Sequence, residues 1–170
     1  GAPLIGPDGV IYPGTCRQIP TGAFPDSAVL RLNMKRALAR LQFEVIEFTD
    51  TGEILSKTSE DMITQIGDVV LARKDMAASY HLSIVVDDAQ QQITHIIRGE
   101  DLREATFIHV LLQKLLGFRT PEYQHHRLIR DDEGRRLAKR DDARAISKYR
   151  ADGYTPDSIR QLLGLPPTTR

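Results

Sequence analysis

Two short stretches of this chain carry side chains suited to binding anions. The first is 135–140, which follows Gly134 and contains four basic residues in six. A cationic loop after a glycine turn suits a polyphosphate, because lysine places a compact charge on a flexible stem. The second is Arg98, which directly follows the largely apolar run 93–97. Since an arginine fork can hold a carboxylate through two charge-assisted hydrogen bonds, the two stretches predict two ligands of one reaction.

Each stretch also has a purely structural interpretation. An arginine at this position could form an ion pair with a nearby acidic residue, namely Glu100, Asp101 or Asp87. The basic loop could be a solvated charged surface. A role for Lys139 in stabilising charge on a transferring phosphorus centre is the functional alternative.

Several further polar residues lie near the arginine in the sequence. Tyr80 stands at the start of the preceding predicted helix, so its ring and hydroxyl could face the same crevice, although a boundary aromatic is the simpler interpretation. His81 and His95 are most simply surface or boundary residues. His125 and His126 are neighbours on an alternating strand, so one should face inward, and a metal pair is disfavoured because their side chains point to opposite faces.

Tyr12 and Cys16 form a Tyr-x3-Cys pair. A thiolate is a good zinc ligand, but structural zinc needs four ligands and the chain has one cysteine. A lone buried thiol is therefore the simpler interpretation. The single cysteine excludes an internal disulfide framework and fits a reducing compartment.

The apolar pattern predicts an α/β fold with a parallel sheet. Strands are expected at 69–72, 93–97 and 128–129, and they alternate with helices at 79–89 and 106–116. Strand, helix, strand, helix, strand is the order of a right-handed parallel unit. Ligands of such sheets bind beyond the carboxyl ends of the strands, which is where the arginine at position 98 would emerge.

Other elements flank this unit. The same patterning predicts strands at 29–32 and 43–48 and a helix at 34–41. Two short helices are expected at 145–151 and 155–164, the second opened by a threonine cap and a proline.

Charge and hydropathy set few limits. The 23 basic and 23 acidic residues cancel, so no overall field favours a nucleic acid or a membrane surface. Residues 119–170 are basic and residues 1–118 are acidic, which hints at an anionic ligand near the C-terminal end. No run approaches the roughly 18 apolar residues that would span a bilayer, so we expect no membrane partner and a cytoplasmic protein.

Five segments in order closely resemble the class I glutamyl-tRNA synthetases, and they are 79–82, 85–88, 94–102, 123–125 and 134–140. Within that family the chain is most similar to its shortened branch, the glutamyl-Q tRNA(Asp) synthetases. Two features favour that branch: the segment from Tyr12 to Cys16 resembles the second half of its zinc site, and the chain ends soon after 162–164.

The resemblance implies roles for individual residues. Tyr80 and Arg98 match positions that bind the glutamate substrate, and Lys139 matches the ATP-contacting lysine of the Lys-Met-Ser-Lys-Ser-type loop. The residues of that loop would be Arg136, Leu137, Ala138, Lys139 and Arg140. Arg136 and Ala138 depart from the usual lysine and serine, which keeps the charge and removes a hydroxyl. Tyr12 and Cys16 would ligate zinc in the parent protein.

The same resemblance implies a reaction. Glutamate and ATP with Mg²⁺ would form an adenylate, and the glutamyl group would pass to tRNA, in the shortened branch to the queuosine of tRNA(Asp). A discriminating glutamyl-tRNA synthetase fragment and a non-catalytic glutamate- or tRNA-binding module are the alternatives.

Nothing in the chain matches the His-Ile-Gly-His-type motif or the Cys-x-Cys pair of the family. We therefore expect the C-terminal half of a Rossmann-like catalytic domain, inactive alone, without stoichiometric zinc, and able to self-associate through an exposed half-sheet. The expected divisions are a zinc-site remnant and linker at 1–28, a connecting subdomain at 29–66, the second half of the catalytic domain at 67–141 and a helical segment at 142–170.

Overall fold

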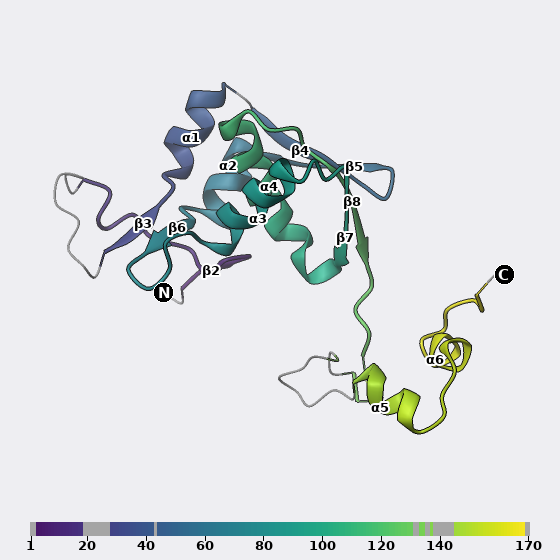
Figure 1. The fold of residues 1–170 in the computed structure, drawn as a ribbon. Coiled ribbons are helices and arrows are strands. Elements are labelled where there is room, and N and C mark those ends of the chain that lie inside the picture. The colour runs from purple at the N-terminus through teal and green to yellow at the C-terminus, as the bar shows by residue number, and fades with distance from the viewer. Residues whose placement is uncertain are drawn as a thin grey trace. The chain divides into compact units, whose positions relative to one another are not determined.

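The computed structural model describes residues 3–18, 28–42, 44–130, 133–134, 137 and 145–168. The chain divides into two compact units, Gly1–His126 and Arg127–Arg170. Figure 1 shows the elements of each unit along the chain.

A four-stranded sheet organises the first unit. Its order is β5-β4-β8-β7, formed by β4 (Val45–Asp50), β5 (Glu53–Thr58), β7 (His95–Gly99) and β8 (Glu122–His126). β4 and β5 form an antiparallel hairpin, whereas β8 runs parallel to both β4 and β7. The turn between β4 and β5 includes Gly52 with φ of 85°, a conformation that glycine adopts without steric cost. The α/β prediction with a parallel sheet is confirmed.

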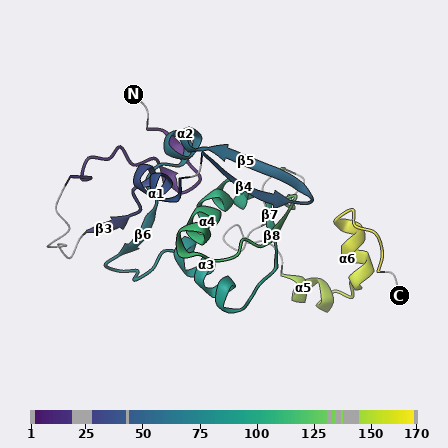
Figure 2. The same cartoon turned by 90° about the horizontal axis from the view of Figure 1, so that it is seen from above.

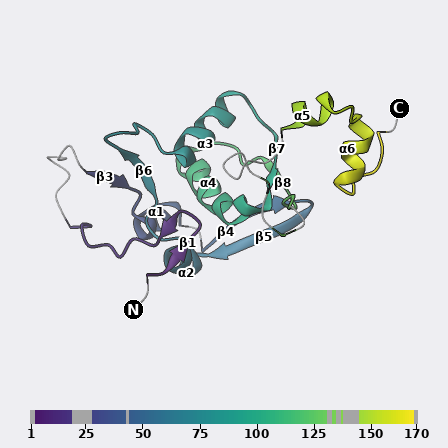
Figure 3. The same ribbon diagram turned by 90° about the horizontal axis from the view of Figure 1, so that it is seen from below.

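Helix α4 (Arg103–Leu116) is the centre of this unit. It packs against β4 and also against α1 (Met34–Leu41) and α3 (Tyr80–Gln90), as Figures 2 and 3 show. Every residue from 105 to 113 is buried, because the helix carries apolar side chains on most of its sides. Gly117 ends α4 with φ of 71°, the left-handed cap that glycine favours.

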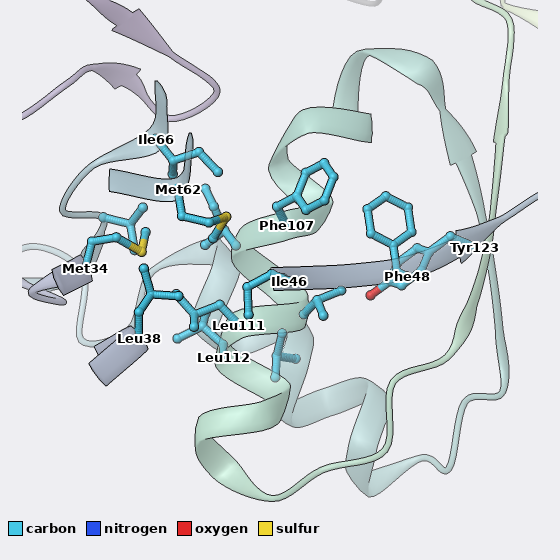
Figure 4. Packing of buried hydrophobic residues seen from close by; sticks show 14 residues of the cluster. Met34, Leu38, Ile46, Phe48, Met62, Ile66, Phe107, Leu111, Leu112 and Tyr123 are labelled. Carbon is cyan, nitrogen blue, oxygen red and sulfur yellow. The ribbon is translucent and has the colours of Figure 1, made fainter. Parts of the chain in front are cut away.

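The hydrophobic core joins α4 to the sheet and to the first helix. Figure 4 shows the side chains of this cluster, with the rings of Phe48, Phe107 and Tyr123 close together. Phe48 meets Phe107 edge to face at 4.9 Å and Tyr123 at 5.3 Å between ring centroids. Such pairs add a modest stabilisation to the burial of their apolar area.

Smaller elements border this core. β1 (Ile5–Gly6) and β2 (Gly9–Val10) form a hairpin, and β3 (Val29–Arg31) pairs antiparallel with β6 (Val70–Arg73). The single-turn elements are α2 (Ser59–Asp61), the π-helical η1 (Met62–Ile66) and the 3-10 turn η2 (Glu100–Leu102).

Buried Asp68 connects several of these elements. Its carboxylate accepts a 2.9 Å hydrogen bond from the backbone N–H of Met34 at the start of α1 and a 2.7 Å bond from Arg17 Nε. Its carbonyl accepts from Arg31 on β3 at 3.0 Å. One acidic residue therefore holds a helix start, a strand and the N-terminal segment together.

Two strand predictions need correction. The run 69–72 was expected in the parallel sheet, but β6 lies outside it and pairs antiparallel with β3. A short apolar run indicates burial without identifying the partner strand. The third parallel strand is β8 at 122–126, not 128–129. Side chains along β8 alternate between the two faces of the sheet, so that Tyr123 and His125 are buried while their neighbours are exposed.

The helix predictions at 34–41, 79–89 and 106–116 are confirmed by α1, α3 and α4. Ser79 caps α3 by accepting a hydrogen bond from the N–H of Leu82 at 3.3 Å. β4 comes from the predicted connecting segment and pairs with β8 from the predicted catalytic segment, so the sheet crosses that predicted division.

The second unit contains α5 (Ile146–Ala151) and α6 (Pro156–Leu162). Thr155 caps α6 and Pro156 occupies its first turn, as the sequence predicted. Tyr149 and Tyr154 pack edge to face at 5.3 Å. Across the described parts of both units, no helix has the length and apolar character needed to cross a membrane.

We predict that Ile108→Ala destabilises the protein by about 2 to 5 kcal/mol, because it leaves a cavity at a fully buried position on α4. Ile54→Ala is the matched control, since that side chain on β5 is 70% exposed and should cost about 1 kcal/mol or less. Urea unfolding of both variants measures the difference. Equal losses would contradict the central position of α4 in the core.

Candidate active site

Arg98 lies near the end of β7, and its guanidinium is held by three neutral side chains. Nε donates to His125 Nε2 at 3.2 Å, Nη1 contacts His109 Nδ1 at 3.1 Å, and Nη2 donates to Thr106 Oγ1 at 2.5 Å. The Tyr123 ring lies beneath it, with 5.1 Å from Cζ to the ring centroid. The guanidinium is therefore fixed in one orientation.

No carboxylate in the described part of the chain forms an ion pair with Arg98. The structural alternative, a pair with Glu100, Asp101 or Asp87, is not what the structure shows. Burial lowers the pKa of Arg98, while Tyr123 and Tyr80 act in the opposite direction. A partly buried cation without a direct counter-ion is favourable only if a ligand or a network compensates it.

Tyr80 lies beside the same cluster. It is the first residue of α3, its side chain is half exposed, and its ring contacts the ring of His109 at 5.9 Å. It also raises the pKa of Arg98, which favours the charged guanidinium. The structure thus brings Tyr80 and Arg98 together from elements that are separate in sequence.

His125 links Arg98 to a buried carboxylate. Its backbone N–H donates to Asp50 Oδ1 at 2.9 Å, and its Nδ1 lies 3.0 Å from the same oxygen. Arg103 Nε lies 3.0 Å from Asp50 Oδ2. Burial raises the pKa of Asp50, but the His125 hydrogen bonds and the Arg103 charge hold it below its ordinary value. Asp50 is therefore a buried anion, and the side chain of His125 lies between it and the guanidinium.

The two imidazoles that contact Arg98 are neutral. Burial, followed by the charge of Arg98, lowers the pKa of His109 to about 3. Burial also lowers the pKa of His125, although Asp50 opposes that shift. A neutral imidazole keeps one nitrogen free to accept, which is what an arginine donor requires.

The predicted ATP loop is only partly described. Arg136, Ala138, Lys139 and Arg140 lie outside the described residues. Leu137 is described, and its N–H donates to the carbonyl of Ile129 at 3.0 Å within the second unit.

Tyr12 and Cys16 are brought together on the N-terminal segment. The backbone N–H of Cys16 donates to the Tyr12 hydroxyl at 2.5 Å, and Cys16 is exposed. The Arg31 guanidinium lies 4.9 Å from the centre of the Tyr12 ring. No group of three or more potential His, Cys, Asp or Glu ligands occurs among the residues that the structure describes. These two side chains alone do not fit a tetrahedral zinc site.

Several residues of this site were not predicted. His109, Thr106 and Asp50 were not singled out in the sequence, and His81 was interpreted as a surface or boundary residue. Polar residues inside the apolar run of α4 were the available signal, since Thr106 and His109 are three apart and share one helix face. His125 was predicted to alternate with His126, and it is the buried one of the two.

A cavity of about 530 Å³ lies elsewhere in the first unit, at the amino end of β7 and the carboxyl ends of α3 and α4. Its lining includes Asp88, Gln113 and Arg119 but neither Tyr80 nor Arg98. This cavity is therefore not part of the site around Arg98.

We predict that stability falls as the pH is lowered from 6.5, because His109 with a folded pKa of about 3 binds its proton more readily in the unfolded chain. The slope is about 1.4 kcal/mol per pH unit for this group. His109→Asn should reduce the difference in unfolding free energy between pH 7 and pH 5 by about 2 kcal/mol. His95→Asn, on an exposed histidine, is the control, and an unchanged pH dependence in His109→Asn would contradict the assignment.

Comparison with known proteins shows the family of this chain. Residues 27–169 match the family described as tRNA synthetases class I (E and Q), catalytic domain. A glutamyl-Q tRNA(Asp) synthetase of Rhodobacter capsulatus is 57% identical over 97% of this chain and 60% of that protein. One from Janthinobacterium is 37% identical over 92% of this chain and 52% of that protein.

Among solved structures, the glutamate tRNA ligase of Elizabethkingia meningosepticum in complex with its amino acid is similar, with a TM-score of 0.54 and 28% identity. The match covers 70% of this chain and 27% of that chain. This chain spans about half to three fifths of the length of the two glutamyl-Q relatives. It belongs to the family of class I tRNA synthetases of the E and Q type, through their catalytic domain.

Proposed function

We propose that Arg98 and Tyr80 bind a carboxylate of L-glutamate. The observation that carries this proposal is the guanidinium of Arg98, which is fixed by neutral acceptors and has no direct counter-ion among the described residues. Both Nη nitrogens carry a second N–H beyond the contacts named above. A ligand carboxylate would supply the missing negative charge, and the Tyr80 hydroxyl could add a directional contact.

The protein that contains this chain would activate glutamate with ATP and Mg²⁺ and then transfer the glutamyl group to tRNA. Family membership supports this reaction class. Lys139 would contact the ATP phosphates from the loop at 136–140. No covalent enzyme intermediate is needed, because such catalysis depends on orientation and on stabilising the developing charge.

We propose the queuosine of tRNA(Asp) as the acceptor. The support is that the relatives from Rhodobacter capsulatus and Janthinobacterium both carry the name glutamyl-Q tRNA(Asp) synthetase. Glutamylation assays with tRNA(Asp) containing queuosine, tRNA(Asp) lacking it and tRNA(Glu) separate this proposal from a discriminating glutamyl-tRNA synthetase. Product only with the first supports queuosine as the acceptor, and product with tRNA(Glu) contradicts it.

A non-catalytic binding module is the second candidate. Arg98 and Tyr80 could bind a carboxylate without any contribution from the loop at 136–140.

Self-association is a further proposal. β7 is an edge strand of the sheet, and its Ile97 is 68% exposed, which is the kind of surface that pairs with another chain. Sedimentation of the chain at increasing concentration tests it.

We predict that Arg98→Ala weakens L-glutamate binding by about 2 to 4 kcal/mol, because the ligand carboxylate loses its charged partner. Arg98→Lys should recover little, since one ammonium cannot reproduce three separate contacts. Calorimetric titration of L-glutamate measures both. Arg73→Ala is the control, because Arg73 forms an exposed pair with Asp75. Unchanged affinity in both Arg98 variants would remove this residue from the site.

We predict that Lys139→Ala lowers the rate of adenylate formation far more than it weakens ATP binding, provided that its ammonium contacts the phosphates mainly in the transition state. The measurement is glutamate-dependent ATP–pyrophosphate exchange. It uses a protein that contains this chain and is as long as the relatives named above. Lys148→Ala, an exposed lysine on α5, is the control. Equal losses in rate and binding would indicate ground-state binding only.

A further inference from the structure

A path of hydrogen bonds leads from Arg98 to the N-terminal hairpin. Arg98 Nη1 lies 3.1 Å from His109 Nδ1, and His109 Nε2 lies 2.9 Å from His81 Nδ1. His81 Nε2 lies 3.1 Å from Asp8 Oδ1, in the turn between β1 and β2. His109 and His81 are 2% and 8% exposed, so water does not replace the contact between the two rings.

Arg98 at one end of this path and Asp8 at the other favour the same direction for the protons between them. Arginine donates and never accepts, so His109 Nδ1 must be the unprotonated nitrogen. The one proton of neutral His109 then lies on Nε2 and points at His81 Nδ1, which accepts it. The proton of His81 is therefore on Nε2 and points at the Asp8 carboxylate. Each step forces the next, because a neutral imidazole has one donor and one acceptor.

The opposite arrangement would place two donors face to face. A proton on His81 Nδ1 would require His109 to accept at Nε2 and to carry its own proton on Nδ1. That proton would point at the N–H of Arg98 and push the guanidinium out of its position. The carboxylate of Asp8 opposes this reversal from the other end of the path, because it can only accept; without it, Arg98 alone would oppose the reversal.

The hairpin holds Asp8 in a defined place. The N–H of Ile11 donates to the carbonyl of Leu4 at 2.9 Å and closes the hairpin. Gly6 packs so closely on η1 that a Cβ there would lie 2.6 Å from the carbonyl oxygen of Gln65. The His81 hydrogen bond lowers the pKa of Asp8, which keeps it ionised.

We propose that Asp8, His81 and His109 are positioning residues, through which the N-terminal hairpin holds Arg98 in the orientation that binds the substrate carboxylate. This inference rests on the proposed glutamate-binding role of Arg98. None of the three residues needs to touch the ligand. They act by keeping unprotonated the His109 nitrogen that faces the guanidinium.

Nitrogen-15 NMR of the histidine rings in the 170-residue chain tests the proposal, because the two neutral tautomers have distinct nitrogen shifts. We expect His109 and His81 both to carry their proton on Nε2 at pH 7. In Asp8→Ala, both rings should show a mixture of tautomers, and L-glutamate affinity should fall about threefold to tenfold. Asp75→Ala, which removes an exposed aspartate in a surface turn, is the matched control and should change neither.

His81→Phe provides a second test, since it removes the same path at a buried ring. It should lower glutamate affinity by a similar factor, and the double variant with Asp8→Ala should be no weaker than His81→Phe alone. Fully independent losses in the double variant, or an unchanged His109 tautomer in Asp8→Ala, would overturn the proposal. Failure of the wild-type chain to bind L-glutamate would overturn the proposed function, while the tautomer measurement would still decide whether the path exists.

Discussion

The placement of one desolvated cation organises this site. The guanidinium of Arg98 is held by His125, His109 and Thr106, none of which carries a formal charge. A direct carboxylate partner would neutralise the arginine and compete with a substrate. Neutral acceptors fix its orientation while leaving its charge available, and this is the arrangement that a carboxylate-binding site needs.

The contacts of Arg98 account for two of the polar residues inside an otherwise apolar core. On α4, Thr106, His109 and Gln113 follow a spacing of three and four, so they share one face. Thr106 and His109 contact Arg98, and Gln113 donates to the Tyr123 hydroxyl at 3.1 Å. The rest of α4 packs against β4 and neighbouring helices. A single helix therefore stabilises the fold on most of its surface and positions the arginine on one narrow face.

Two carboxylates are connected to the guanidinium through imidazoles without touching it. Asp50 contacts His125, and Asp8 contacts His81, which in turn contacts His109. Because imidazoles transmit donor and acceptor roles from one nitrogen to the other, remote residues can determine how Arg98 presents its N–H groups. The N-terminal hairpin is thereby connected to a site built from the central sheet and helices.

The sequence by itself determined the class of fold, most helices, the family and two principal ligand-binding candidates. Periodicity identified α1, α3 and α4 because each buries an apolar face, and the position of Arg98 after an apolar run indicated where it would emerge. The partner of β6 and the identity of the third parallel strand came only from the tertiary structure, since a short apolar run does not specify its neighbour. The same holds for the path from Asp8 to His81, which are 73 positions apart and meet only after the hairpin packs on the core. Local sequence patterns indicate which side chains are buried. Long-range packing decides which buried polar groups come close enough to form hydrogen bonds with one another.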